Sequence, residues 1–127
     1  MSMSSFALAT SLTYFFTAAA VGNRPSSWQV RLHTANPGDG ASNEVSDSGY
    51  SRQGATFSMS GAQTAVSNAS DINFGTAASG FTVTHISIWD AANGVPLATQ
   101  RLSADKVVAA GAQVIMAAGE LTIGGAA

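Results

Sequence analysis

The sequence contains no cysteine, which excludes disulfide bonds and thiolate metal sites. Charge is also scarce: charged residues make up 9% of the chain, compared with roughly 25% in an average globular domain. A free monomer normally relies on surface charge to stay dispersed. This scarcity therefore favours a chain whose surface is largely covered by a partner or by copies of itself.

The few basic residues do not form a patch. The formal net charge is -2, and the five basic side chains are scattered along the sequence: Arg24, Arg31, Arg52, Arg101 and Lys106. A nucleic-acid-binding surface needs a basic stripe or cluster, so nucleic acid is not expected as a partner.

The first basic residue is Arg24, and the preceding stretch "SSFALATSLTYFFTAAAVG" is apolar and rich in hydroxyls. A signal peptide would carry a basic residue before its apolar run, and a membrane span would be longer and carry fewer hydroxyls. An amphipathic helix fits better, because one face collects Leu8, Leu12, Phe15, Phe16 and Ala19. We therefore predict a helical segment over residues 1–22, no membrane contact, and helix packing either on its own chain or on a neighbour.

Residues 23–127 read as one β-rich domain. "SWQVRLHT" alternates apolar and polar side chains, and turn residues recur at intervals of about 8–12 residues. The pattern predicts a mainly β fold: an antiparallel β-sandwich, jelly-roll-like, of about seven or eight short strands with an N-terminal α-helix.

The strongest predicted strand, "FTVTHISIWDAANG", changes phase within its length. Phe81 and Val83 share one parity, while Ile86 and Ile88 share the other. Either a β-bulge near His85 or burial of both faces would reconcile the two halves.

No catalytic set can be assembled from the sequence. There is no Gly-x-Ser-x-Gly elbow, and both His33 and His85 lie inside predicted strands, where a locally hydrogen-bonded structural role is expected. The acids of the polar loop, Asp39, Glu44 and Asp47, are five and three residues apart, which is unlike a calcium loop. We therefore expect no enzymatic activity, no cofactor and no metal.

An ordered set of motifs resembles a family of small tailed-bacteriophage virion proteins. The resemblance covers roughly residues 5 to 123 and rests on residues 32–37, 43–46 and 49–53 with Phe57, then 83–85, 89–91 and 118–121. The turn "ANGVPL" departs from the pattern, because it lacks an expected second glycine.

The resemblance implies a virion structural protein. A capsid decoration or cement protein that binds the major capsid protein on the outer shell is the first expectation, and a minor tail or tail-fibre component that binds tail proteins is the alternative. A homo-oligomer is expected, with a trimer as one form. A carbohydrate-binding sandwich module is a further alternative, which needs Trp28, Tyr50 or Trp89 exposed on a flat face.

Within the recurring block, Glu44, Tyr50 and Arg52 are the candidate intersubunit or capsid contacts, together with Phe15 and Phe16 of the apolar helix. The simpler alternative is that Glu44 pairs with Arg52 to hold the loop against the sheet. Trp28 and Trp89 are expected in the core.

Overall fold

A computed structural model describes residues 2–22, 24–59, 61 and 65–124 of the chain. Within these residues the chain forms one helix and ten strands, and the paired strands are antiparallel. In chain order the elements are β1 (Ser2–Met3), α1 (Ser5–Phe16), β2 (Trp28–His33), β3 (Gln53–Ala55), β4 (Phe57–Met59), β5 (Ala65–Asn68), β6 (Ile72–Thr76), β7 (Gly80–Asp90), β8 (Val95–Ala109), β9 (Gln113–Met116) and β10 (Thr122–Gly124). The predicted mainly β, antiparallel fold with an N-terminal helix is confirmed.

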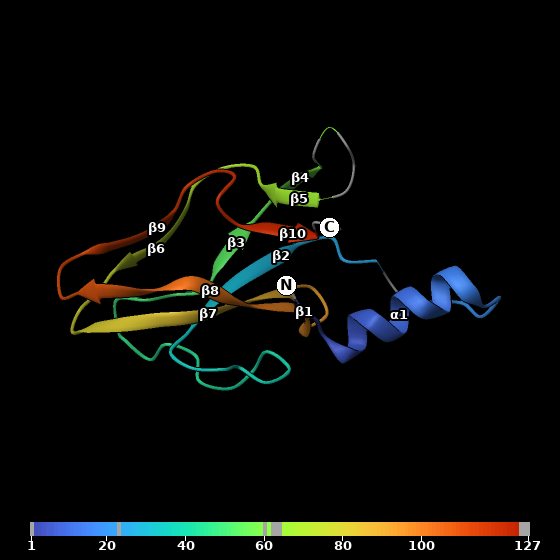
Figure 1. The fold of residues 1–127 in the computed structure, drawn as a ribbon, viewed down its shortest axis with the longest axis horizontal. Coiled ribbons are helices and arrows are strands. Elements are labelled where there is room, and N and C mark those ends of the chain that lie inside the picture. Colours follow the sequence, from blue (N-terminus) through green and yellow to red (C-terminus); the bar gives the residue numbers. More distant parts are fainter. Residues whose placement is uncertain (1, 23, 60, 62–64, 125–127) are drawn as a thin grey trace.

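One larger sheet faces two smaller ones. The five-stranded sheet has the order β1-β8-β7-β2-β3, and the other strands form β10-β5-β4 and β6-β9 (Figure 1). The core contains Val30 and Leu32 of β2, Ile86 and Ile88 of β7, and Phe74 of β6. The third sheet adds Phe57 of β4 and Ile123 of β10, which pack against this core. Apolar side chains from two layers therefore meet in a single core, as in a sandwich whose second layer is divided.

The chain changes sheet at Thr56. β3 pairs with β2, whereas β4, which begins at the next residue, pairs with β5 in the opposite layer. The alternation in "YSRQGATFSM" predicts that Ala55, Phe57 and Met59 share one face. Ala55 and Phe57 do pack against the core, but Met59, at the end of β4, is 60% exposed.

The pairing of β7 with β8 contains the predicted bulge. The register shifts between Val83 and His85, so that Thr84 alone faces residues 102–105 of β8. Beyond the bulge, residues 86–90 are buried on both faces. The irregularity lies where it was predicted, near His85, although its extra residues belong to β8. Burial of both faces is observed for residues 86–90.

Strand β8 differs from its prediction. The sequence pattern predicts separate short strands in "VPLATQRL" and "KVVAAGAQVIM", with a turn at Gly111, whereas the structure has one strand from Val95 to Ala109. Residues 102–105 of β8 form the bulge opposite Thr84, and the pairing of β8 with β7 continues on both sides of it without a turn. The predicted turn at Gly111 is present, and its φ of 84° suits glycine.

Candidate functional site

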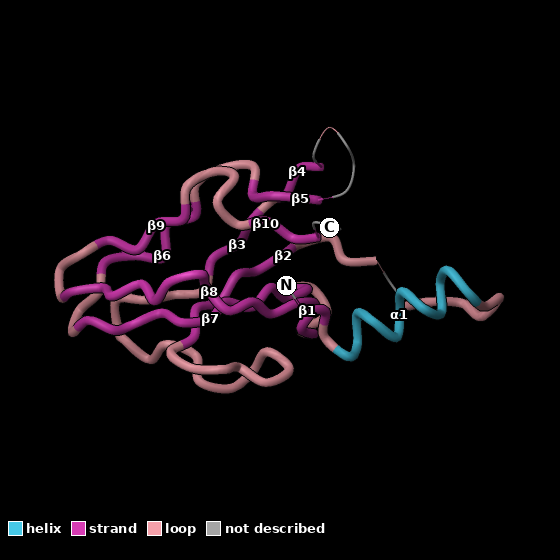
Figure 2. The backbone as a smooth tube through the Cα atoms, in the orientation of Figure 1, coloured by secondary structure: helices cyan, strands magenta, loops and turns pink. Residues whose placement is uncertain are grey.

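Residues 34–49 form a loop that folds over the outer face of the five-stranded sheet (Figure 2). The loop follows β2 and returns beside it through an isolated bridge between His33 and Glu44. Backbone bonds close it further: Thr34 N–H donates to Asn43 O at 2.9 Å, and Val45 N–H donates to Leu32 O at 3.0 Å. These bonds hold residues 43–45, in the returning half of the loop, against the end of β2.

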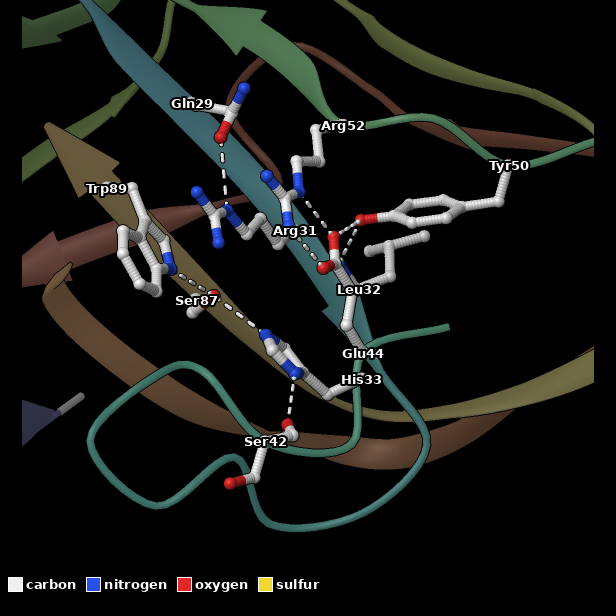
Figure 3. Close-up of polar contacts among 10 residues, drawn as sticks. All are labelled: Gln29, Arg31, Leu32, His33, Ser42, Glu44, Tyr50, Arg52, Ser87 and Trp89. Carbon is white, nitrogen blue, oxygen red and sulfur yellow. Dashed lines mark hydrogen bonds and ion pairs between the residues drawn. The ribbon is translucent and has the colours of Figure 1, made fainter. Parts of the chain in front are cut away.

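Glu44, Tyr50 and Arg52 are brought together at the end of this loop (Figure 3). Arg52 binds the Glu44 carboxylate through both oxygens, at 2.9 and 2.8 Å. The Tyr50 hydroxyl donates to Glu44 Oε2 at 2.8 Å and accepts from the Leu32 N–H at 3.1 Å. The predicted pairing of Glu44 with Arg52 is confirmed, and Tyr50 links that pair to the backbone of β2.

The surroundings of Glu44 favour its ionised form. Burial works against the charged carboxylate, but the hydrogen bonds from Arg52 and Tyr50 outweigh it, so the pKa of Glu44 is lowered. Burial and the bond to Glu44 raise the pKa of Tyr50, which keeps its hydroxyl protonated as the donor. Because Arg52 remains 46% exposed, it can also reach a partner.

A second group of hydrogen-bonded polar side chains lies beneath the loop and includes His33. Its Nδ1 lies 2.8 Å from Ser42 O, and its Nε2 lies 2.7 Å from Ser87 Oγ. The Trp89 indole N–H donates to the same Oγ at 3.0 Å (Figure 3). A carbonyl oxygen only accepts, so Nδ1 carries the proton and Nε2 accepts from the Ser87 hydroxyl. These contacts are all satisfied by a neutral His33, and burial, which lowers the pKa of His33, favours the same form.

Trp89 is covered on the outer face of the sheet. The Arg31 guanidinium lies 3.6 Å from the ring centroid, a cation–π contact, and Arg31 Nε donates to Gln29 Oε1 at 3.0 Å. Gly40 of the loop approaches the indole so closely that a Cβ there would lie 3.5 Å from Trp89 Nε1 and 2.9 Å from Pro96 Cβ. The loop thus packs onto Trp89 through a position that only glycine fits.

Asp47 secures the far end of the loop. Its Oδ1 accepts from the N–H groups of Gly49 and Ala78, and its Oδ2 accepts from Ser79 and Gly80, all at 2.8–3.0 Å. These bonds, led by that from Ala78, hold the pKa of Asp47 at about 2. The sequence indicated only a turn acid here, because the partners lie some thirty residues away.

The other acid and histidine candidates do not converge on a reaction centre. Asp39 accepts a hydrogen bond from the Ser5 hydroxyl, and His85 Nδ1 lies 2.7 Å from Thr84 Oγ1. In the described part of the chain, no group of three or more His, Asp or Glu side chains is placed to hold a metal ion.

The three aromatic residues that the carbohydrate-binding alternative requires, Trp28, Tyr50 and Trp89, form no flat exposed face. Trp89 is buried, and Trp28 and Tyr50 are half-buried against the core. Trp28 packs edge-to-face on Phe57, with ring centroids 6.4 Å apart. Trp28 packs against the core, as predicted, whereas Trp89 is buried on the outer face beneath Arg31 and the loop, outside the main core cluster. The carbohydrate-binding alternative lacks the exposed aromatic face that it requires.

Phe15 and Phe16 lie far from the loop cluster, at the end of α1, which projects from the β layers beside β1 (Figure 1). No residue of α1 is buried. Its exposed apolar side chains are Phe6, Leu8, Leu12, Tyr14, Phe15 and Phe16. Among the described helices none is long and apolar enough to cross a membrane.

The two sides of α1 have different surroundings. Phe6, Thr10 and Tyr14 line a hollow of about 590 Å³ between the helix, the returning chain around Pro25, and Leu97 of β8. At 100° per residue, Leu8, Leu12 and Phe16 lie on the opposite side. Phe15 lies between the two sides: it is 72% exposed and also lines the edge of the hollow. The apolar face that the sequence predicted is therefore real, and it points away from the sheet of its own chain.

The comparison with protein families covers both the helix and the β layers. A family model described as podophage GP4 fiber I protein gp80 matches residues 2–124. A search of the curated proteins finds no match to the chain. The family match therefore includes α1, the covering loop and the described strands.

Proposed function

Because the chain belongs to the family of the podophage GP4 fiber I protein gp80, we propose that it is a structural subunit of a tail fibre in a tailed phage. The match over residues 2–124 carries this proposal. Membership makes the chain a phage virion structural protein of a fibre-like type. The first expectation from sequence, a capsid decoration protein, is not confirmed, and the family favours the tail alternative.

The proposed role is attachment and shape rather than catalysis. Support comes from what the polar residues already do: His33 is committed to Ser42 and Ser87, and Glu44 is committed to Tyr50 and Arg52. These contacts fix a loop over a sheet and engage both side chains in holding it there, which supports a structural role. A rigid building block suits a fibre, because fibre geometry depends on fixed angles between neighbouring subunits.

Two surfaces are available for assembly. One is α1, whose uncharged apolar side chains lie in solvent. The other is the loop cluster, where half of Arg52 remains accessible beside its ion pair. The partners proposed for these surfaces are tail proteins and copies of the same chain, and the major capsid protein is the partner under the capsid alternative. Direct contacts by Glu44, Tyr50 and Arg52 remain a prediction.

The location can be tested on intact particles. Antibodies raised against the folded protein, detected with gold in electron micrographs, are expected to mark the tail, and antibodies against the major capsid protein serve as the control. In parallel, particles assembled without this chain are expected to lose fibre density in cryo-electron microscopy while their heads stay filled. Gold over the head shell, with unchanged fibres in the deletion particles, would contradict the proposal.

A further inference from the structure

The base of α1 is fixed to the β layers by polar contacts. Ser4, which is buried, donates its N–H to Leu97 O at 2.7 Å and its hydroxyl to Pro96 O at 2.5 Å. The same hydroxyl accepts from the Ala7 N–H at 3.0 Å and so caps the helix. One serine therefore starts the helix and attaches it to β8.

The covering loop adds a second attachment at the same end. Asp39 accepts from the Ser5 N–H at 3.2 Å and from the Ser5 hydroxyl at 2.8 Å. A carboxylate also complements the positive end of the helix dipole. The direction of α1 is thus set by specific contacts, although the rest of the helix lies in solvent. An apolar helix of 12 residues is marginal in water without packing, so its outer face needs a partner.

The outer face has the spacing of a helix–helix seam. Leu8, Leu12 and Phe15 are separated by four and then three residues, the a/d alternation that packs knobs into holes. The next position in the same series is Ala19, which follows the helix end. A surface of this kind is suited to another helix with the same spacing.

Charge points to an identical partner. Residues 1–23 contain no acidic or basic side chain, so two copies of α1 meet without like-charge repulsion. A different partner is usually selected by complementary charges at the edge of the seam, and the helix offers none. Self-packing needs only shape and apolar surface, which the helix has.

The exposed area is sufficient for a weak specific contact. Leu8 and Leu12 are each 49% exposed, Phe15 is 72% exposed and Phe16 is 80% exposed. With aromatic side chains offering about 150–250 Å² each, the four side chains present roughly 500 Å² per copy. Two copies together then bury about 1,000 Å², the lower limit for a specific interface.

We propose that α1 is the self-association element of the fibre subunit, in which the face formed by Leu8, Leu12, Phe15 and Phe16 packs on the same face of a second copy. The inference rests on the proposed function and names the partner of one of its two assembly surfaces. It concerns the isolated protein in solution. The location on the particle is tested separately, so the two can fail independently.

The first test is sedimentation of the full chain over roughly 1–100 μM, where a contact of this size dissociates. We expect concentration-dependent association, at least tenfold weaker after the combined change Leu8→Gln, Leu12→Gln and Phe15→Gln, because glutamine keeps the helix propensity of leucine. The matched controls are Phe6→Gln on the hollow side of the helix and Val107→Gln, an equally apolar exposed position on β8. A wild-type monomer throughout, or an equal loss in the controls, would overturn the proposal.

A second test does not depend on the fold of the triple variant. The chain has no cysteine, so a single Leu12→Cys substitution introduces the only thiol. Leu12 lies near the middle of α1 and meets its counterpart in either relative direction of the two helices. Mild oxidation is expected to yield a covalent dimer of the Leu12→Cys variant and little dimer of a Val107→Cys control. Equal yields from both variants, or none from either, would refute self-packing.

Discussion

Replacing Ser87 with alanine should destabilise the fold through two buried groups at once. The Ser87 hydroxyl donates to His33 Nε2 and accepts from Trp89 Nε1, at 2.7 and 3.0 Å. Ser87 and His33 are fully buried, and Trp89 is buried beneath Arg31 and the loop. The Ser87→Ala variant therefore leaves one acceptor and one donor without a partner.

The expected loss follows from the desolvation of those groups. A buried polar group left unsatisfied costs about 1–3 kcal/mol, so two of them cost roughly 2–4 kcal/mol after partial relaxation. Urea unfolding followed by tryptophan fluorescence measures this directly, because Trp89 is part of the chain of contacts. Ser103→Ala, at an exposed position on β8, is the matched control and should change stability by less than about 0.5 kcal/mol. A loss below about 1 kcal/mol in Ser87→Ala, with an unchanged m-value, would refute the role assigned to the chain of contacts.

Three further predictions concern the same loop. Burial lowers the pKa of His33 below its ordinary value of 6.5, so at acidic pH the unfolded chain binds more protons than the folded one. The free energy of unfolding should therefore be flat above about pH 7 and fall as the pH drops from 6.5 toward 5, by at most about 1.4 kcal/mol per pH unit. Urea titrations at each pH measure this slope, and the His33→Gln variant should lose it. A double-mutant cycle of Glu44→Gln and Arg52→Gln should give a coupling of about 1 kcal/mol, reduced by 0.5 M salt, because Arg52 is half exposed; a coupling unaffected by salt would contradict this. Gly49→Ala should destabilise by more than about 2 kcal/mol in thermal unfolding, since its Cβ would overlap Thr76 O, whereas Gly94→Ala, where a Cβ has free space but φ is 67°, should cost only about 1 kcal/mol; similar losses at both positions would contradict the close packing of Gly49.

The local features of the fold were predictable because they depend on neighbours in sequence. The bulge near His85 follows from a change of parity between Val83 and Ile86, and the structure places a register shift there. The apolar face of the helix follows from the spacing of Leu8 and Leu12. Each pattern is read within a single element, where the period of the backbone decides which side chains share a face.

The features that sequence reasoning missed depend on distant partners. Asp47 reads as an ordinary turn acid, yet it binds the backbone at residues 78–80. Ser4 reads as part of a hydroxyl-rich run, yet it attaches the helix to β8, 92 residues away. A serine directly before an apolar helical run is a common N-cap, so the capping role of Ser4 could be read from the sequence. Nothing in the sequence indicates its contact with Pro96.

The candidate site shows the same division. The pairing of Glu44 with Arg52 was predictable, because these opposite charges are only eight residues apart, one in the loop and one just after it. The polar chain through His33, Ser87 and Trp89 was not, since it joins residues of β2 and β7 that meet only through the sheet register. The polar loop is therefore a cover for the outer face of the sheet, which its composition alone did not distinguish from a binding arm.

The central claim is that this chain is a fibre subunit of the virion, and its copy number in purified particles tests that claim most directly. Quantitative mass spectrometry against the major capsid protein gives the ratio, with a known tail protein as internal standard. The account predicts a small count that matches the rotational symmetry of the tail. A count comparable with that of the major capsid protein would contradict it and place the chain on the shell.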